Sequence, residues 1–584
     1  MKLIHIIISL LLLSMNLLGN IINVNNAEDL EIAAETASPG DTIIVATGIY
    51  DTEGSITMIS GGTETAPILI KAAELGSVEL TGETYFDLRQ IAFVTIQGFI
   101  FTSTDVTAIK SQASNHIRIT QNVFRLRETE SRKWIVIQGI WDNPNAPSHH
   151  NRIDHNLFED KHLPGNFITI DGQADPVYQS SQYDLIDHNH FRNIGPRVQN
   201  EMEAVRIGWS EMSMSSGFTT LEYNLFEDCD GDPEIVSVKT CDNIVRYNTF
   251  RSSQGTLSLR HGNRSTVQGN FFFGEGKPGS GGLRVYGDDH VLVNNYFHGL
   301  LGTTWDAPIT LTNGDYDSGT SYSNHFRINR ALVLNNTLVE NTHNIEIGFT
   351  NNGNYDRPPR DVIMKNNLVY GGGDDLIIIH TEPINMTWMT NLMYHKTGGN
   401  IGLSLPSNQI LSVDPDLELV DGLYRLSSVS PAINSGTPTT AISIDMDGQP
   451  RSTPSDIGAD EYNIIDPILT YPLTASDVGP QALDPVAIDL GSNMLPQAPT
   501  VQISQYPNPF NSQTILSIAA ISHETMSVHL LDIRGRYLKE IWHGVFSQDE
   551  LKLNLDMNIY PSGQYFVVVR TKMGNSIKAI HHLK

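Results

Sequence analysis

The chain has 584 residues, of which 40% are hydrophobic and 17% charged, and it carries 47 glycines and a formal net charge of -28 at pH 7. Its length exceeds one average domain, and few charges with many glycines are typical of a protein rich in strands and turns. The negative charge argues against nucleic acid as a partner, because DNA binding needs a basic surface that displaces counterions. We attribute the charge to solubility outside a cell.

Residues 1–20 have the pattern of a secretory signal peptide, with Lys2, an apolar run from Leu3 to Leu18, and then small or polar residues. An uncleaved membrane anchor is the alternative, but the run is short for a helix that spans a bilayer. Since no later segment is apolar enough to cross a membrane, we expect no membrane span in the mature form.

Residues 27–37 (AEDLEIAAETA) predict a helix, and residues 42–45 predict a strand after a Pro-Gly-Asp turn. A helix in this position is suited to cap the open strand edges of a repeat structure.

A short signature then recurs, in which an apolar-polar run ends in Asn-x-Phe or a close variant. The copies begin at Asn122, Asn156, Asn189, Asn224, Asn248, Asn270 and Asn295, with weaker ones at Asn336, Asn366 and Asn391. The central spacings are 24, 22 and 25 residues, and longer spacings are expected where loops are inserted. Such a period is the mark of a solenoid, and β-branched, alternating runs such as 291–293 make each unit a set of strands.

The repeat predicts an all-β fold, a right-handed parallel β-helix. Each coil would place its Phe or Leu over the one below, and the aligned asparagines would hydrogen-bond one another at a turn. An antiparallel sandwich is the alternative, but it would show hairpin turns instead of a phased series of asparagines. At the rear the series fades near residue 400, and residues 417–462 are expected to form a closing coil.

The stretch 232–260 carries charges within strand-like sequence: Asp232, Glu234, Lys239 and Arg260. Counted from the repeat asparagine of each coil, Asn200, Glu234, Lys239, Arg260 and Arg284 have offsets between 10 and 15 residues. Similar phase in successive coils, about 4.8 Å apart, predicts that these side chains and Asp232 share one strip of the surface. Each alone is typical of a solvated or salt-bridged residue, but their common phase favours a functional site.

These residue types match β-elimination across a uronic acid, in which a base removes the C5 proton and the C4 oxygen leaves. A cation on the substrate carboxylate would stabilise the charge that develops. Oxygen ligands from Asn200, Asp232 and Glu234 favour calcium, and Lys239 is the candidate base, its ammonium form disfavoured by nearby cations. Arg260 would protonate or stabilise the leaving oxygen, although arginine is a poor acid, and His261 is placed to assist. Arg206 and Arg284 would pair with substrate carboxylates, with structural ion pairs as the alternative.

Four runs resemble polysaccharide lyase family 6: 200–208 (NEMEAVRIG), 234–239 (EIVSVK), 254–263 (QGTLSLRHGN) and 281–285 (GGLRV). That family contains alginate lyases and the dermatan-cleaving chondroitinase B. The resemblance extends over most of residues 22–460. It implies a calcium-assisted lyase with Lys239 as base, Arg260 as acid, and Asn200, Asp232 and Glu234 as ligands. Two features depart from the family pattern, since Asp232 stands where glutamate is usual, and the Asn-Gly-Gly-Glu run is here Asn200-Glu-Met-Glu203.

We therefore expect an enzyme that acts on alginate, an anionic polysaccharide. One alternative is a dermatan sulfate lyase, which would need extra basic subsites; another is a β-helix that only binds polysaccharide, which would not need a base. A glycoside hydrolase would use two carboxylates and leave Lys239 and Arg260 unexplained. Only Cys229 and Cys241 are present, which excludes a disulfide framework and leaves a single bridge or two buried thiols open.

Residues 463–500, rich in Pro and Ala, predict a linker between a lyase domain at 21–462 and a small β-sandwich at 501–584. The last segment resembles the C-terminal sorting domain of the type IX secretion system of Bacteroidetes-like bacteria. Its landmarks are 506–511 (YPNPFN), 532–536 (DIRGR), 562–565 (SGQY) and a terminal Lys584. The resemblance implies the type IX secretion machinery as a partner, export through the periplasm of a Gram-negative bacterium, and a secreted or cell-surface location. A carbohydrate-binding module is the competing interpretation.

Overall fold

The computed structural model describes residues 19–583, apart from 141–142, 144–145, 174–177, 318–321, 440–441, 464–465, 467, 483–500, 507–509, 521–524, 533–536, 546–550 and 572–573. The predicted signal peptide lies almost entirely outside the described residues, as do parts of the predicted linker and of the sorting motifs. By its internal contacts the chain divides into one unit that ends at Ala482 and a second that begins at Leu483. None of the helices in the described part of the chain combines the length and apolar character that crossing a membrane requires.

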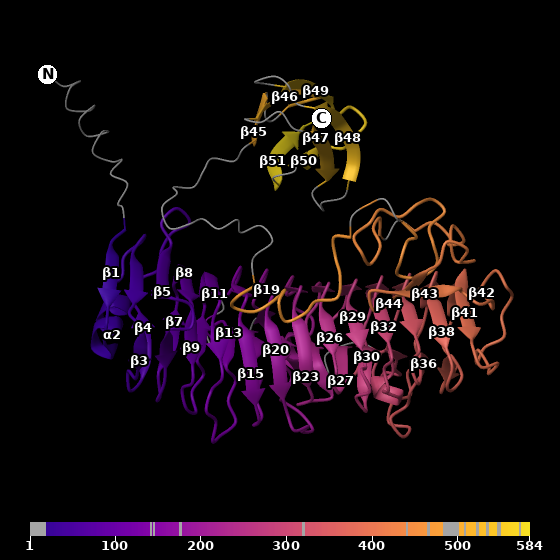
Figure 1. Cartoon of the computed structure of the whole chain (residues 1–584), viewed down its shortest axis with the longest axis horizontal. Helices are drawn as coiled ribbons and strands as arrows, with labels where there is room; N and C mark the ends of the chain where they lie inside the picture. The colour runs from indigo at the N-terminus through magenta and orange to yellow at the C-terminus, as the bar shows by residue number, and fades with distance from the viewer. Residues whose placement is uncertain are drawn as a thin grey trace. The chain divides into compact units, whose positions relative to one another are not determined.

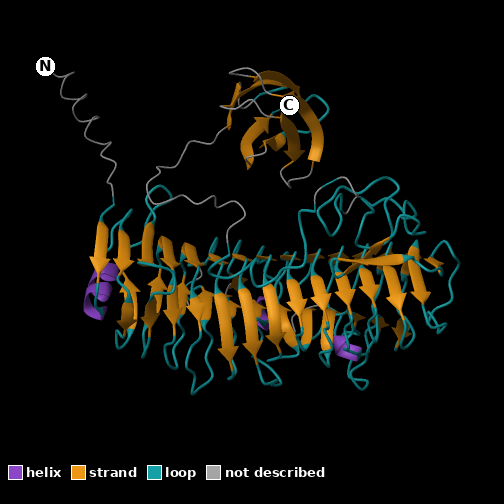
Figure 2. Cartoon of the chain, in the orientation of Figure 1, coloured by secondary structure: helices purple, strands orange, loops and turns teal. Residues whose placement is uncertain are grey.

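The first unit is a stack of coils, and each coil between its two ends contributes one strand to each of three parallel sheets (Figures 1 and 2). This architecture confirms the predicted parallel β-helix. The first sheet has 14 strands. In spatial order they are β1 (Ile21–Val24), β2 (Thr42–Val45), β5 (Ile68–Ala72), β8 (Ala92–Gln97), β11 (Asn115–Thr120), β14 (Arg152–Asp154), β19 (Leu185–Asp187), β22 (Thr220–Glu222), β25 (Ile244–Arg246), β28 (Thr266–Gln268), β31 (Val291–Val293), β34 (Leu332–Leu334), β37 (Ile363–Lys365) and β40 (Thr387–Met389).

The second sheet has 12 strands and carries the candidate site residues. Its strands are β4 (Ser55–Met58), β7 (Tyr85–Arg89), β10 (Ile109–Gln112), β13 (Ile135–Gln138), β16 (Ile168–Ile170), β21 (Val205–Ile207), β24 (Glu234–Val238), β27 (Gly255–Leu259), β30 (Ser280–Val285), β33 (Ile309–Leu311), β36 (Ile345–Ile347) and β39 (Ile377–Ile379).

The third sheet has 14 strands and follows the repeat asparagines. Its strands are β3 (Gly48–Tyr50), β6 (Val78–Leu80), β9 (Phe99–Phe101), β12 (Val123–Phe124), β15 (Leu157–Lys161), β20 (His190–Ile194), β23 (Leu225–Cys229), β26 (Thr249–Arg251), β29 (Phe271–Phe273), β32 (Tyr296–His298), β35 (Thr337–Val339), β38 (Leu368–Gly371), β41 (Asn391–His395) and β42 (Ile410–Leu411).

A column of stacked phenylalanines fills the interior beside the third sheet. Neighbouring ring centroids lie 4.6 to 5.0 Å apart in the series Phe124, Phe158, Phe191, Phe226, Phe250, Phe272 and Phe297. Each ring comes two residues after a repeat asparagine, so the sequence period places it over the ring below. Close packing of large apolar side chains in this column supplies much of the core.

The asparagines form the expected buried ladder. The Asn248 Oδ1 atom accepts hydrogen bonds from the Asn224 backbone N–H at 3.0 Å and the Asn224 amide at 2.9 Å. Asn248 in turn donates to Asn270 Oδ1 at 2.9 Å and to the Leu221 carbonyl at 2.9 Å. One position was predicted wrongly, because the asparagine that pairs with Asn336 is Asn367 and not Asn366. The next strand in this coil begins one residue later than the Asn-x-Leu signature suggested.

The predicted N-terminal cap is α2 (Ala27–Thr36), and it packs against β1, β2 and β4. Asn26 caps it by accepting a hydrogen bond from the Asp29 backbone N–H at 2.8 Å, and Leu30, Ala33 and Ala34 are its buried residues. Two short 3₁₀ helices, η1 (Ser210–Met212) and η2 (Thr304–Asp306), lie in loops after the second sheet's β21 and before its β33. A small ribbon pairs β17 (Gly172–Gln173) with β18 (Gln179–Ser180).

The expected closing coil at 417–462 is wrong. This segment begins with an antiparallel hairpin of β43 (Leu417–Val420) and β44 (Leu423–Leu426) and then runs back along the outside of the third sheet. Leu423, Met446 and Ala459 pack on Phe271 and Tyr296, and further along Leu473 and Val478 pack on Leu225. The segment lacks a repeat asparagine and phenylalanine, so it cannot continue the ladder and instead covers apolar side chains on the outer face.

The second unit consists of two antiparallel sheets around a separate apolar core that includes Leu516, Val528 and Val567. One sheet has the order β45 (Val501–Tyr506), β46 (Gln513–Ala520) and β49 (Leu551–Asp556). The other has the order β48 (Tyr537–Val545), β47 (Thr525–Asp532), β50 (Gly563–Thr571) and β51 (Gly574–His582). These sheets agree with the small β-sandwich that the sequence predicts.

Candidate active site

Lys239 and Arg260 are neighbours because of the coil register. Val238 at the end of β24 pairs with Leu259 at the end of β27, and the two basic residues follow directly. Arg206, Ser237, Ser258 and Arg284 form one row across β21, β24, β27 and β30. The register shifts beside Glu234 and beside Gly255, and such bulges commonly redirect side chains next to functional sites.

A cavity of about 690 Å³ opens over these strands. It brings together seven of the eight predicted site residues: Asn200, Asp232, Glu234, Lys239, Arg260, His261 and Arg284. Arg206 does not line it. The Arg206 guanidinium is buried and lies 3.2 Å from an Asp171 carboxylate oxygen, which is the structural ion pair weighed as the alternative. A substrate-binding role for Arg206 therefore stays a prediction.

The two acids of the Asp-x-Glu pair have opposite electrostatic surroundings. Burial, together with Glu203 and Glu234, raises the pKa of Asp232 to about 8. Burial would also raise the pKa of Glu234, but Arg284, Lys239 and Arg260 outweigh it and the pKa is lowered. The Glu234 Oε1 atom lies 3.5 Å from Arg260 Nε and 3.8 Å from Arg284 Nη1, and Ser237 donates a hydrogen bond to Oε2.

Glu203 is an unpredicted member of this group. It is buried, its Oε1 atom lies 3.6 Å from the Lys239 Nζ atom, and Asn166 donates a hydrogen bond to its Oε2 atom at 2.7 Å. The sequence predicts surroundings that disfavour the ammonium form of Lys239. Glu203 acts in the opposite sense, because a carboxylate at this distance stabilises a positive charge.

The donor set fits a hard cation. Asn200, Asp232 and Glu234 line one cavity and offer only oxygen ligands, the kind that calcium binds. Asp232 accepts hydrogen bonds from the backbone N–H groups of Glu234 at 2.9 Å and Met202 at 3.3 Å, which orient its carboxylate. Burial first, and then the nearby Glu203 and Glu234 carboxylates, raise the pKa of Asp232, and a bound cation would stabilise its ionised form against both.

The far wall of the cavity comes from loops that the repeat does not predict. Trp305, Asp306, His325 and Tyr355 line it with Arg197. The Arg284 guanidinium lies 5.4 Å from the Trp305 ring centroid, and the Trp305 and Tyr355 rings meet edge to face at 5.9 Å. Their signal in the sequence was limited to aromatic residues within long insertions.

The histidines here are neutral at ordinary pH. Burial, with Arg260 and Lys239 nearby, lowers the pKa of His261 to about 2, and burial with Arg260 lowers the pKa of His325 still further. The His261 Nε2 atom lies 3.3 Å from the Ser210 hydroxyl and 3.4 Å from an Arg260 nitrogen. A neutral His261 acts as a hydrogen-bonding group, and it carries no positive charge for a substrate carboxylate.

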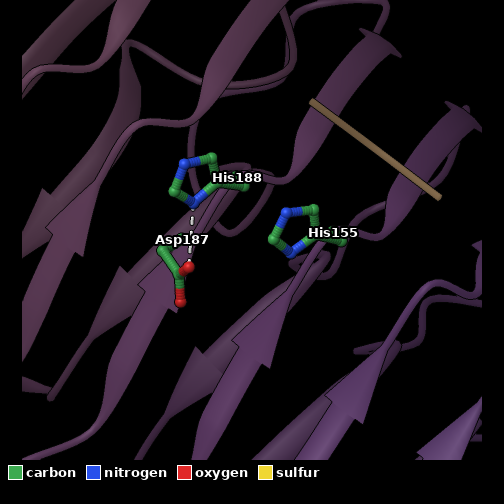
Figure 3. Close-up of side chains that lie close together, drawn as sticks. All are labelled: His155, Asp187 and His188. Atoms are coloured by element: carbon green, nitrogen blue, oxygen red, sulfur yellow. Dashed lines mark hydrogen bonds and ion pairs between the residues drawn. The ribbon is translucent and has the colours of Figure 1, made fainter. Parts of the chain in front are cut away.

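Among the described residues, two tight groups of metal-type ligands lie away from this cavity. Figure 3 shows the first, His155, Asp187 and His188. The histidine rings are stacked at 4.9 Å and within 2° of parallel, so their lone pairs do not converge on one point. Arg152 already pairs with both Asp187 oxygens, at 2.8 and 2.7 Å. Ring stacking and the Arg152–Asp187 ion pair therefore account for this group, and we assign it a structural role and not a metal-binding one.

The second group is Asp445, Asp447 and Asp460. Arg425 pairs with Asp447 and lies 3.0 Å from an Asp460 oxygen. Asp445 accepts backbone hydrogen bonds from Asp447 and Gln449 at 2.9 and 2.8 Å. The carboxylate oxygens thus already have partners within the protein, and the group stabilises the segment that runs back along the third sheet after residue 417.

Cys229 and Cys241 are both buried free thiols. Of the two possibilities that the sequence left open, a single bridge or two thiols, the structure has the two thiols.

Fold and site together define a parallel β-helix protein whose cavity combines carboxylates with a lysine and three arginines. The chain belongs to the chondroitinase B family, because the model of that family matches residues 24–422, more than half of the sequence. Residues 504–581 match the secretion system C-terminal sorting domain. A comparison with curated proteins found no match.

Solved structures agree with this assignment. The PL6 family alginate lyase AlyGC is 27% identical over 79% of this chain with a TM-score of 0.63, and the match spans 58% of the AlyGC chain. Two others share the fold at lower identity. A mannuronic acid specific polysaccharide family 6 lyase from human gut microbiota is 21% identical, covering 68% of this chain and 91% of its own, with a TM-score of 0.57. The PL6 family lyase Pedsa3628 from Pseudopedobacter saltans is 20% identical, covering 79% and 99%, with a TM-score of 0.54.

Proposed function

We propose that the protein is an exported polysaccharide lyase that cleaves alginate by β-elimination and leaves an unsaturated uronate at the new chain end. One observation carries the proposal: Lys239 and Arg260 follow neighbouring strands and face a single cavity with a carboxylate cluster. A binding protein has no use for a half-buried lysine beside acids, and a hydrolase would need two carboxylates set across a sugar.

Lys239 is the proposed base. In its neutral form its amine takes the C5 proton, and Glu203 at 3.6 Å orients the side chain toward the cavity. Arg260 is placed one coil further on, where its guanidinium stabilises the negative charge on the departing C4 oxygen. Arg284, buried beneath Trp305, is suited to hold a substrate carboxylate.

Asn200, Asp232 and Glu234 are the proposed calcium ligands. When bound there, calcium would stabilise the charge on the uronate carboxylate as the C5 proton is removed. Asp232 has one methylene fewer than the glutamate expected from the family pattern, so we expect its reach to the ion to depend on the two backbone N–H groups that fix it.

The cavity favours a uronate polymer without sulfate. Its described cations each have an acidic partner within 4 Å: Arg197 with Asp306, Lys239 with Glu203, and Arg260 and Arg284 with Glu234. A sulfated galactosamine would require additional unpaired positive charge. The resemblance to AlyGC, itself an alginate lyase by name, supports the same choice. Dermatan sulfate is the second candidate, because the matching family model is that of chondroitinase B.

The C-terminal match supports export by the type IX secretion machinery, with the protein released or held at the cell surface. Under this proposal residues 21–462 form the lyase domain and 501–584 the sorting domain, after removal of a signal peptide at 1–20. Residues 463–500 connect the two domains, and the part of this linker up to Ala482 packs with the first unit.

The test is ultraviolet absorbance of the new double bond when the protein meets alginate or dermatan sulfate, with calcium or with a chelator. We expect a calcium-dependent signal on alginate that is lost in Lys239→Ala. A signal on dermatan sulfate alone would show that dermatan sulfate, and not alginate, is the substrate. A folded wild-type protein that gives no signal on either polymer would contradict the proposed function.

A further inference from the structure

The row of side chains that carries Arg284 continues into coils that the proposed reaction does not use. Arg284 in β30 pairs with Thr310 in β33, and Thr310 pairs with Glu346 in β36. The Thr310 and Glu346 side chains are wholly buried, and a buried carboxylate is costly unless it has partners. Both bond to the loop that contains η2, and that loop carries Trp305 and Asp306 of the cavity wall.

The backbone of Thr304 in this loop is strained. Its φ is +55°, in the left-handed region that β-branched residues rarely adopt. Such a conformation costs free energy and persists only where the surrounding structure imposes it. Thr304 is the first residue of η2 and directly precedes Trp305, so its conformation sets the direction in which the chain presents the indole.

Two buried side chains hold Thr304 in this conformation. The Glu346 Oε1 atom accepts a hydrogen bond from the Thr304 backbone N–H at 2.7 Å. The Thr310 hydroxyl donates a hydrogen bond to the Thr304 carbonyl, also at 2.7 Å. Both polar backbone groups of Thr304 are therefore fixed by side chains of the sheet that carries the candidate site.

Two histidines fix Glu346 in turn. His343 Nδ1 bonds to Glu346 Oε1, and His380 Nε2 lies 2.6 Å from Oε2. The other His343 ring nitrogen lies 2.9 Å from an Asp374 carboxylate oxygen. Burial alone would raise the pKa of Glu346, but the hydrogen bonds from the two histidines and from the Thr304 N–H lower it. Glu346 is therefore ionised and serves only as an acceptor.

We propose that Glu346 is a positioning residue of the cavity: it holds the Thr304 turn so that Trp305 keeps its place in the cavity wall. The proposal rests on the proposed function, in which Arg284 holds a substrate carboxylate. The Arg284 guanidinium lies 5.4 Å from the Trp305 ring centroid, and the Trp305 ring meets Phe349 edge to face at 4.8 Å. A displaced indole would therefore displace the guanidinium that packs against it.

This role separates binding from chemistry. Glu346 does not line the cavity, whereas Lys239 and Arg260 do. Loss of Glu346 should weaken the binding of the polymer through Trp305 and leave the groups that carry out the elimination in place. Such a change raises KM and leaves kcat nearly unchanged.

The experiment is a double-mutant cycle on the polymer with the wild type, Glu346→Ala, Trp305→Ala and the double variant. We expect Glu346→Ala to raise KM by about 10- to 100-fold and to keep kcat within about threefold of wild type. In the Trp305→Ala background the same substitution should change KM by less than about threefold, because the group through which it acts is gone. The matched control is Glu227→Ala, which removes a carboxylate 2.7 Å from His190 on the third sheet, outside the cavity, and should leave both constants unchanged.

Equal increases in KM in both backgrounds would overturn the proposal, as would a Glu346→Ala variant with a wild-type KM or with a loss confined to kcat. Thr310→Val decides the question if Glu346→Ala does not fold, since it replaces only the hydroxyl that holds the Thr304 carbonyl. It should raise KM by about three- to tenfold, and that increase should disappear in the Trp305→Ala background. A wild-type KM in Thr310→Val would overturn the proposal.

The outcome for the proposed function is distinguishable from the outcome for Glu346. A wild type that forms no double bond on any uronate polymer contradicts the proposed function itself. An active wild type that tolerates the loss of Glu346 contradicts only the positioning role.

Discussion

The Nζ atom of Lys239 lies 3.6 Å from the Oε1 atom of Glu203, and the Glu203 side chain is almost wholly buried. The other Glu203 oxygen is held by the Asn166 amide. Glu203 therefore positions Lys239, the proposed base, and Asn166 in the coil of β16 fixes Glu203 in turn. The positions of Lys239 and Glu203 both follow from the stacking of the coils.

Glu203→Gln tests this positioning. The substitution keeps the size of the side chain but removes the charge that holds Lys239, so we expect kcat to fall by about 10- to 100-fold with little change in KM. Glu340→Gln, which removes a surface partner of Lys396, is the control and should leave both constants unchanged. A change in KM alone would show that Glu203 serves binding and not the orientation of the base.

Calcium binding is testable without activity. We expect calcium to raise the melting temperature of the wild type, because a ligand at 100 times its Kd stabilises the folded state by about 2.7 kcal/mol. Asp232→Asn removes one proposed ligand and should abolish most of that increase, while raising the melting temperature in chelator, since Asp232 is crowded by Glu203 and Glu234. Equal calcium shifts in both proteins would place the ion elsewhere.

The asparagine ladder should be a large contributor to stability. Asn248→Ala leaves the buried Asn224 backbone N–H without its acceptor and the Leu221 carbonyl without its Asn248 donor, while the Asn224 amide still donates to the Ile186 and Glu222 carbonyls. At about 1–3 kcal/mol for each unsatisfied buried group, we expect a loss of roughly 2 kcal/mol or more in the free energy of unfolding. Denaturant unfolding measures it, with the exposed Asn408→Ala as control. A loss below about 1 kcal/mol would mean that water takes over the hydrogen bonds that Asn248 makes in the ladder.

The buried cluster of Asp445, Asp447 and Asp460 predicts that the free energy of unfolding depends on pH. Burial raises the pKa of Asp460 to about 7, with Asp447 and Asp445 adding to the shift against Arg425. A carboxyl whose pKa is raised on folding binds its proton more tightly in the folded state. Its stabilising contribution is complete below the unfolded pKa near 4 and is lost as pH rises through about 7.

Asp460→Asn isolates this effect from the other titrating groups. Between pH 5 and pH 8 the wild type should lose stability relative to the variant, with a slope of up to about 1.4 kcal/mol per pH unit. Melting temperatures of both proteins across this range provide the measurement. A difference that does not change with pH would show that Asp460 stays ionised at pH 5 and above.

The fold was predictable because a solenoid repeats one physical problem in every coil. Each coil must satisfy its buried polar groups at the turn and fill its interior. An Asn at the turn and a Phe two residues later do so only if the same residues recur in the next coil, so the spacing of Asn224, Asn248 and Asn270 is recognisable in the sequence. The signal fails where the repeat is interrupted. The Asn-x-Leu pattern predicts Asn366 in a coil with two adjacent asparagines, but the ladder residue there is Asn367. A closing coil is also predicted after residue 417, but that segment has no ladder asparagine and begins with a hairpin.

The site divides in the same way. Lys239, Arg260 and Arg284 follow the coil period, so their phase predicted that they face one cavity. Trp305 and Tyr355 come from insertions, whose conformations depend on contacts such as the Trp305–Arg284 pair and not on the period. Glu203 lies in one of the runs that resemble the family, but the sequence does not predict a role for it, because only the three-dimensional register brings it beside Lys239.

The central claim is that this cavity cleaves the polymer by elimination. The most direct test is to cleave the polymer in water enriched in ¹⁸O and to measure the masses of the products by mass spectrometry. Elimination at Lys239 and Arg260 predicts products that contain no solvent oxygen, that carry a C4–C5 double bond at the new end, and that are absent with Lys239→Ala. Products that contain one ¹⁸O atom for each cut and no double bond would show hydrolysis, and would contradict the account of this cavity as a site of elimination.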